Sequence, residues 1–292
     1  MDESQQVLAR TRSGPSNPLR VGFEATTSAL REAARLAFLE ARVEGRCVVA
    51  ACAGLAGTRQ IDAARKVHEG LASIFPEAKI CVLTDLALSL EATGQRPAIV
   101  LVAGTGSAAV GWDSEGRLSR AGGHGPLLGD QGSAYDVGRQ AIISALRSRD
   151  RTRADTLLGA QILEQLECPS WQELQNRART AADEVFPRVF PVVVAAADDG
   201  SQVARGLLRD SARELVALVE VLVERLSLRE VSFLLAKTGG MIGRSAFLDK
   251  ELDDRLKQVA PHAEIGALPI SPAEAGARVA LSLISPRESA GN

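Results

Sequence analysis

Aromatic residues are scarce in this chain of 292 residues, at 3%, and neither sign of charge dominates, with 34 Lys and Arg against 36 Asp and Glu. The net charge of −2 excludes a polybasic surface for nucleic acid or membranes, because such surfaces need a strong excess of Lys and Arg. No apolar run reaches the ~20 residues of a membrane span. The opening residues, MDESQQVLARTR, lack the order of a signal peptide. We therefore expect a cytoplasmic protein with neither a nucleic-acid nor a membrane partner.

Cysteine is also rare, and its spacing is not that of a metal site or a disulfide scaffold. The four cysteines contain no C-x-x-C pair and are Cys47, Cys52, Cys81 and Cys168. We expect them to be buried, reduced thiols that pack as small hydrophobes. His124 has no cysteine or histidine at metal-ligand spacing, so we expect no protein metal site around it.

Short continuous apolar runs predict an α/β fold. The runs Cys47–Ala53, Ile80–Leu83 and Ala98–Ala103 are typical of strands that are covered on both faces. Helical periodicity over Phe23–Val43 and Ile61–Ile74 places a helix before the first strand and another before the second. This alternation predicts parallel pairing through right-handed crossovers.

The rest of the chain adds a hairpin, a long helical stretch and a return to α/β structure. A length of 292 residues is enough for two ordinary domains, and the best boundary lies around Ala98–Ser107. The expected elements are a hairpin of Ala108–Trp112 and Leu118–Ala121, a helix from about Ser133, helices over most of 155–227 with breaks near Pro169, Pro187 and Pro191, a strand Val231–Ala236, a helix Ser245–Val259, a strand near Ile265 and a closing helix Ser271–Ile284.

Two glycine-rich turns follow predicted strands. Gly104-Thr105-Gly106-Ser107 offers backbone N–H groups and hydroxyls, which are the donors that a phosphate needs. A simple turn between two strands explains the same residues. Gly239-Gly240 stands between a strand and a helix, where glycines admit an adenine or ribose edge. Neither turn has the Walker or the G-x-G-x-x-G sequence.

Two aspartates are candidates for chemistry, and each has a structural alternative. Asp85 follows a strand at its carboxyl end, where ligands bind in open α/β sheets. It either accepts a proton from a hydroxyl nucleophile or caps the helix that follows. Asp130 lies in the glycine-dense segment 122–133, and it either accepts hydrogen bonds from sugar hydroxyls or caps the next helix.

Taken in order, these motifs resemble the BadF/BadG/BcrA/BcrD-type ATPases, and within them the N-acetylglucosamine kinase branch of the actin, sugar-kinase and heat-shock chaperone superfamily. The resemblance covers nearly the whole chain. It rests on Gly14-Pro15-Ser16-Asn17, Ala53-Gly54-Leu55-Ala56-Gly57, Leu83-Thr84-Asp85, Ala103-Gly104-Thr105-Gly106-Ser107, Gly122-Gly123 through Gly129-Asp130-Gln131-Gly132-Ser133, and Gly239-Gly240.

The resemblance implies two ribonuclease-H-like, actin-like ATPase domains around a cleft. We expect residues 1–103 to form the first domain, 104–270 the second, and a closing helix over 271–286 to pack back on the first. Relatives open with an Asp-Gly-Gly-Gly-Thr phosphate loop between two strands, and this sequence contains no such run. We therefore expect the first domain to be incomplete at its N-terminus, with Gln5–Arg12 as the family's third strand.

The resemblance also implies an ATP-dependent kinase that phosphorylates the 6-hydroxyl of an amino sugar, with N-acetylglucosamine as the expected acceptor. Magnesium would bridge the ATP phosphates. Relatives are often dimers, so a homodimer is also open for this protein. The implied site residues are Asp85 as general base, Thr105 and Gly106 with Gly104 at the phosphates, Gly239 and Gly240 at adenosine, and Asn17, Ser107, Gly123 and Asp130 at the sugar.

Two positions depart from the sugar-kinase pattern, and two other functions stay open. His124 replaces the usual Trp, and Gln131 replaces the usual Glu, so no carboxylate chemistry is assigned to position 131. A non-catalytic sugar sensor is one alternative, because the first phosphate loop is absent. An ATPase activator of a 2-hydroxyacyl-CoA dehydratase, which holds an iron–sulfur cluster through cysteines, is the other.

Overall fold

A computed structural model describes residues 1–152 and 156–284, and the chain divides into two compact units. Unit 1 contains residues 1–94 and those from Leu268 onward, and unit 2 contains Gln95–Ala267. The division after Gly94 precedes the expected one after residue 103, because the strand Ala98–Ala103 pairs with the unit 2 strands Ser107–Trp112 and Phe233–Thr238. Residues 285 and 286 of the expected closing helix and position 155 of the expected helical stretch lie outside the described residues.

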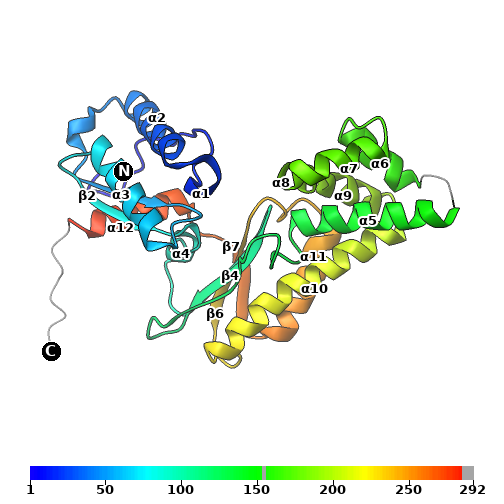
Figure 1. Ribbon diagram of the computed structural model, residues 1–292. Coiled ribbons are helices and arrows are strands. Elements are labelled where there is room, and N and C mark those ends of the chain that lie inside the picture. The colour runs from blue at the N-terminus through cyan, green and yellow to red at the C-terminus, as the bar shows by residue number, and fades with distance from the viewer. Residues whose placement is uncertain (153–155, 285–292) are drawn as a thin grey trace. The chain divides into compact units, whose positions relative to one another are not determined.

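Unit 1 is built around a two-stranded parallel sheet (Figure 1). Its elements are α1 (Pro18–Val21), α2 (Phe23–Ala41), the 3-10 turn η1 (Gly45–Cys47), β1 (Ala50–Gly54), α3 (Ile61–Ile74), β2 (Lys79–Leu83), α4 (Asp85–Glu91) and α12 (Pro272–Ser282). Helix α3 makes the crossover between β1 and β2, and α12 returns to pack beside β1 and α4. The apolar faces of α3 and α4 form two small clusters against the strands.

Helix boundaries in unit 1 follow local capping chemistry. The Thr84 side chain accepts a hydrogen bond from the N–H of Ala87 and begins α4. Ser271 caps α12 in the same way, through the N–H of Glu274, and Pro272 occupies the first turn, where its missing N–H costs nothing. These caps fix the points at which the loops after the strands become helices.

Three expectations for unit 1 are wrong. Residues Gln5–Arg12 form no strand, since no neighbouring strand is there to accept their hydrogen bonds. The first strand begins at Ala50 instead of Cys47, which lies in a 3-10 turn. The run Ala98–Ala103 is a strand as expected, but it pairs in unit 2 and does not extend the sheet of unit 1.

Unit 2 combines a mixed five-stranded sheet with a helical region. Its strands are β3 (Ala98–Ala103), β4 (Ser107–Trp112), β5 (Leu118–Gly122), β6 (Phe233–Thr238) and β7 (Ala263–Ala267), in the order β5-β4-β3-β6-β7. Its helices are α5 (Ala134–Thr152), α6 (Leu157–Gln165), α7 (Trp171–Thr180), α8 (Ala182–Val185), the 3-10 turn η2 (Pro187–Val189), α9 (Phe190–Asp198), α10 (Gln202–Arg225) and α11 (Ala246–Val259).

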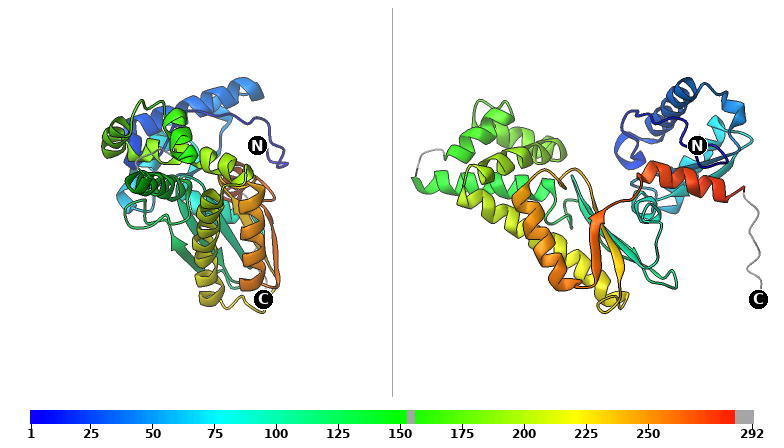
Figure 2. Two further views of the ribbon diagram at one scale, coloured as in Figure 1. Left: turned by 90° about the vertical axis from the view of Figure 1, so that its right-hand side faces the viewer. Right: turned by 180° about the vertical axis from the view of Figure 1, so that it is seen from behind.

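The core of unit 2 lies between the sheet and two long helices. Helices α10 and α11 run side by side against the strands, as Figures 1 and 2 show from different sides. Buried side chains such as Ile99, Leu215 and Leu235 join one continuous cluster that extends into α5–α9. Strand β3 is parallel to β6 and antiparallel to β4, so the turn after β3 and the turn after β6 lie at the same edge of the sheet.

The expectation that all four cysteines are buried holds for only some of them. Cys168 is buried, but Cys47 is exposed, and Cys52 and Cys81 are half-buried partners on the neighbouring strands β1 and β2. Burial, and then the adjacent Cys81 thiol, raise the pKa of Cys52 to about 12. None of the helices in the described ranges is long and apolar enough to cross a membrane.

Candidate functional site

The Gly104–Ser107 turn is tied to the start of α5. Ala103 and Ser107 pair across the turn, and the N–H of Gly104 donates to the Gly106 carbonyl at 3.0 Å. The N–H of Ala134 donates to the Gly104 carbonyl at 2.9 Å. No hydrogen bond within the described residues uses the N–H of Thr105 or Gly106. The turn is therefore held through its carbonyls, while two N–H groups remain for an anion.

Asp130 contacts this turn and does not cap a helix. It has a left-handed φ of 59°, and its Oδ1 accepts from the N–H of Ser107 at 3.4 Å. The N-terminus of α5 is capped instead by Ser133, whose Oγ accepts from the N–H of Asp136 at 3.3 Å. The capping interpretation of Asp130 is wrong, because the left-handed residue turns its carboxylate back toward Ser107.

Ser107 links the turn to the two neighbouring glycine-rich segments. Its hydroxyl donates to the Gln131 carbonyl at 2.8 Å, and its carbonyl accepts from the N–H of Gly123 at 2.9 Å. Ser107, Gly123 and Asp130, which the family resemblance predicts to contact the sugar, are thus held within one hydrogen-bonded network. That network is continuous with the N–H groups of the turn.

The Gly239-Gly240 turn lies against the end of β3. The N–H of Met241 donates to the Ala103 carbonyl at 3.0 Å. Gly239 has a φ of +113°, and a β-carbon there would lie 2.2 Å from the Ala103 oxygen, so only glycine fits. A β-carbon on Gly104 would lie 3.5 Å from the Gly240 nitrogen. Unit 2 therefore brings together all of its predicted site residues, namely Gly104, Thr105, Gly106, Ser107, Gly123, Asp130, Gly239 and Gly240.

Asp85 is the first residue of α4, directly after β2 in unit 1. Thr84 provides the cap of this helix, so the capping interpretation of Asp85 is wrong. The Asp85 side chain is exposed, and its carboxylate has no hydrogen bond or ion pair among the described residues. A carboxylate in this position is available to an incoming hydroxyl.

Asn17 shares unit 1 with Asp85 and is connected to it through one loop. Its Oδ1 accepts from the N–H of Leu19 at 3.0 Å, which caps α1 and leaves the side-chain NH2 as a donor. A β-carbon on Gly57 would lie 2.7 Å from that oxygen. The same loop is fastened to the end of β2, because the Thr58 hydroxyl donates to the Leu83 carbonyl at 2.8 Å. Sequence reasoning missed Thr58, although a hydroxyl next to the Gly-rich loop was a visible signal.

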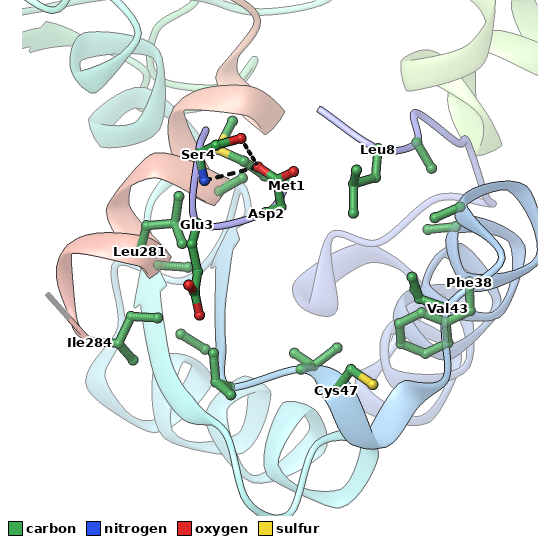
Figure 3. A pocket seen from close by; sticks show the side chains of 18 residues that line it. Met1, Asp2, Glu3, Ser4, Leu8, Phe38, Val43, Cys47, Leu281 and Ile284 are labelled. Atoms are coloured by element: carbon green, nitrogen blue, oxygen red, sulfur yellow. Dashed lines mark hydrogen bonds between the residues drawn. The ribbon is translucent and has the colours of Figure 1, made fainter. Parts of the chain in front are cut away.

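A separate apolar pocket of about 600 Å³ in unit 1 has no such chemistry (Figure 3). Its wall includes Phe38 from α2, Cys47, and Leu281 near the end of α12. The dashed lines in Figure 3 join Ser4 to the Asp2 carboxylate, a local turn at 2.8 and 3.0 Å. Neither Asn17 nor Asp85 lines this pocket, so it is distinct from the predicted site.

The donor sets fit a nucleotide better than a resident metal ion. The two unbonded N–H groups of the Gly104–Ser107 turn match phosphate oxygens, and the close approach at Gly239 keeps the second turn free of side-chain bulk. In the part of the chain that the structure describes, no cluster of three or more His, Cys, Asp or Glu side chains has the arrangement of a metal site. A Mg²⁺ ion held mainly by phosphates and water needs no such cluster.

The fold of this chain matches those of solved structures. It matches the solved structure of a candidate N-acetylglucosamine kinase from Chromobacterium violaceum with a TM-score of 0.71 at 23% identity, over 94% of this chain and 89% of that one. It also matches a ROK hexokinase from Thermus thermophilus with a TM-score of 0.52 at 14% identity, over 89% and 86% of the two chains. These likenesses show a mixed α/β fold of the actin-like ATPase class.

The sequence then gives the family. The pattern of the BadF/BadG/BcrA/BcrD ATPase family matches residues 1–277, and the chain belongs to this family. It is 31% identical to an N-acetylmuramic acid/N-acetylglucosamine kinase of Clostridium acetobutylicum, over 84% of this chain and 81% of that protein. It is 28% identical to an N-acetyl-D-glucosamine kinase of Dictyostelium discoideum, over 97% and 93%. The resemblance inferred from the motifs is confirmed.

Proposed function

We propose that this protein transfers the terminal phosphate of ATP to the 6-hydroxyl of an amino sugar, with N-acetylglucosamine as the acceptor. The observation that carries the proposal is the hydrogen-bonded network of unit 2, in which Asp130 and Ser107 adjoin a turn with two free N–H groups. The kinase names of the relatives from Clostridium acetobutylicum and Dictyostelium discoideum support it.

Asp85 is the proposed general base. Its exposed carboxylate, free of hydrogen bonds among the described residues, accepts the proton of the sugar hydroxyl as the oxygen attacks phosphorus. Thr84 caps α4 and so holds the backbone of Asp85 at the first position of this helix. Fixed placement of this kind raises the rate because less orientational freedom is lost during the reaction.

The phosphate and nucleotide contacts are assigned to unit 2. The N–H groups of Thr105 and Gly106 donate to the terminal phosphate oxygens, where negative charge is concentrated during transfer. Gly239 and Gly240 leave room for adenosine beside the turn. Bound Mg²⁺ would supply further neutralisation of the phosphate charge.

In unit 1 the proposed sugar contact is Asn17, and in unit 2 the proposed contacts are Ser107, Gly123 and Asp130. Asn17 donates through its side-chain NH2, since its oxygen already caps α1. Asp130 accepts from a sugar hydroxyl, and Ser107 and Gly123 complete the set through the network that joins them to Asp130. Carboxylate and amide groups are suited to hydroxyl recognition because each makes directional hydrogen bonds.

The test is a pair of variants measured in two assays. Asp85→Asn should abolish phosphate transfer while N-acetylglucosamine affinity, measured by calorimetry, stays within a few-fold. The matched control Ser170→Ala removes the N-cap of α7, a helix that carries no proposed site residue, so it should lower the unfolding free energy by about 1 kcal/mol and retain turnover. Unchanged turnover in Asp85→Asn would remove Asp85 from the base role. Sugar binding by the native protein without ATP binding would instead indicate a sugar sensor.

A further inference from the structure

Four of the described loops meet at one edge of the sheet in unit 2. Strand β3 is parallel to β6, β6 is parallel to β7, and β4 is antiparallel to both β3 and β5, so the carboxyl ends of β3, β5, β6 and β7 lie at the same edge. The loops that follow these ends are residues 104–106, 123–133, 239–245 and 268–271. Both glycine turns of the proposed nucleotide site belong to this set. The fixed charges of these loops therefore act on a ligand that binds at this edge.

These four loops contain a single Lys or Arg. It is Arg244, in the loop between β6 and α11, and the only Asp or Glu in the same loops is Asp130. A nucleotide carries several negative charges on its phosphates, which the carboxylate of Asp130 repels and a cation attracts. Arg244 is therefore the one arginine or lysine that these loops offer to a phosphate.

The backbone of the loop that carries Arg244 is anchored at several points. The N–H of Met241 donates to the Ala103 carbonyl at 3.0 Å, which ties the loop to the end of β3. The N–H of Arg244 donates to the Met241 carbonyl at 3.2 Å. The N–H of Gly243 donates to both carboxylate oxygens of Asp249, at 3.2 and 3.1 Å, which ties the loop to the first turn of α11. The backbone of Arg244 is thus held a few residues from the adenosine turn.

The guanidinium of Arg244 is available to a ligand. The side chain is exposed, and it has no hydrogen bond or ion pair in the part of the chain that the structure describes. Two acidic residues of α11 that could compete for it have other partners. Asp249 accepts from the loop backbone, and Asp253 pairs with Lys237 at the end of β6. The fold therefore leaves this cation without a counter-charge beside a site proposed for a polyanion.

We infer that Arg244 binds the α-phosphate of the nucleotide. The proposed function assigns the terminal phosphate to the N–H groups of Thr105 and Gly106 and adenosine to the turn at Gly239-Gly240. The α-phosphate is the one attached to the ribose, so it is the phosphate closest to the loop that follows the adenosine turn. A guanidinium donates two parallel hydrogen bonds to phosphate oxygens, which gives both affinity and orientation. This inference rests on the proposed function, because that function supplies the nucleotide.

The experiment measures the binding of ATP, AMP and adenosine by calorimetry. The proteins are the native chain, Arg244→Ala, Arg244→Lys and the control Arg229→Ala, which removes an exposed arginine just before β6, at the opposite edge of the sheet. Arg244→Ala should weaken the binding of ATP and of AMP by about 10- to 100-fold, and adenosine affinity should change less than about twofold. Arg244→Lys should recover part of the loss because it keeps the charge, and Arg229→Ala should behave as the native protein.

The outcomes separate this inference from the proposed function. Unchanged ATP affinity in Arg244→Ala overturns the inference, as does a native protein that binds no ATP. An equal loss for adenosine also overturns it, because the side chain would then act on the base, the ribose or the fold. A loss for ATP without a loss for AMP places the cation at a later phosphate and overturns it as well. If the native protein binds ATP through Arg244 but phosphorylates no sugar, the inference stands and the proposed function fails.

Discussion

The carboxylate of Asp130 occupies the space beside Gly106, where a β-carbon on the glycine would lie 2.8 Å from Asp130 Oδ2. The same carboxylate accepts the N–H of Ser107, so the turn and the aspartate hold each other in place. Gly106 has no left-handed φ, which means that the requirement for glycine comes from this contact and not from the backbone.

Gly106→Ala should therefore displace Asp130 and misplace the phosphate turn. We expect kcat/KM for phosphate transfer to fall by about 100-fold, while urea unfolding shows a loss of about 1–3 kcal/mol from overpacking. The control is Gly206→Ala in α10, where nothing lies within 4 Å of the new methyl group. That variant should retain activity, and similar losses of activity in both variants would contradict the role of the Asp130 contact.

Gly239 and Gly240 make a second matched pair. Gly239→Ala meets the Ala103 oxygen at 2.2 Å and has an unfavourable φ, so it should lower the unfolding free energy by about 2–4 kcal/mol. Gly240→Ala has nothing within 4 Å and should change stability by less than about 1 kcal/mol. If adenosine lies against this turn, Gly240→Ala should weaken ATP binding in calorimetry. Unchanged ATP affinity would place the nucleotide elsewhere.

Glu274 at the start of α12 provides a pH-dependent contribution to stability. Hydrogen bonds from Arg10, and next from Arg278, lower the pKa of its carboxyl below the ordinary 4.5. A lowered native pKa contributes stability above the unfolded value, and this contribution is lost as the pH falls through the native value. Glu274→Gln should thus lower Tm at pH 7, and the difference from the native protein should shrink below about pH 4.5. A difference in Tm that does not change between pH 7 and pH 3 would contradict the assignment.

The cysteines should differ sharply in reactivity. Cys47 is exposed, whereas burial and the neighbouring Cys81 raise the pKa of Cys52 to about 12 and keep it a thiol at neutral pH. In native protein at pH 8, iodoacetamide should modify Cys47 first and leave Cys52 largely intact, as read by peptide mass spectrometry. In urea the two should react alike. Equal rates in the native state would show that Cys52 is not shielded.

Strong periodic patterns in the sequence are sufficient for much of the fold. The helix expected over Ile61–Ile74 and the strand expected over Ala98–Ala103 have those bounds in the structure. Both segments are uniform, one with a regular apolar face and the other with a continuous apolar run, so local and tertiary preferences agree. The expected strand from Cys47 fails because pairing with β2 begins only at Ala50, and pairing is decided by a distant segment.

The contacts of the site residues are harder to predict from the sequence, because several residues near a helix start have the side chain of an N-cap until the first helical residue is known. Thr84 and Asp85 are both good N-caps, and only the first helical residue decides which one acts. Asp130 also resembles a cap, but its left-handed φ turns the carboxylate toward Ser107. The order of the motifs in the sequence predicted the residues that unit 2 brings together. Their contacts could not be predicted, because they depend on turns that no local pattern specifies.

The most direct test of the proposed kinase activity is to identify the product formed from N-acetylglucosamine and ATP-Mg. Phosphorus NMR of the reaction mixture should show a phosphate monoester on the sugar C6 oxygen with the native protein and none with Asp85→Asn. ATP hydrolysis without a sugar phosphate, or sugar binding with no phosphate transferred to any hydroxyl, would contradict the central claim that this protein is an amino-sugar kinase.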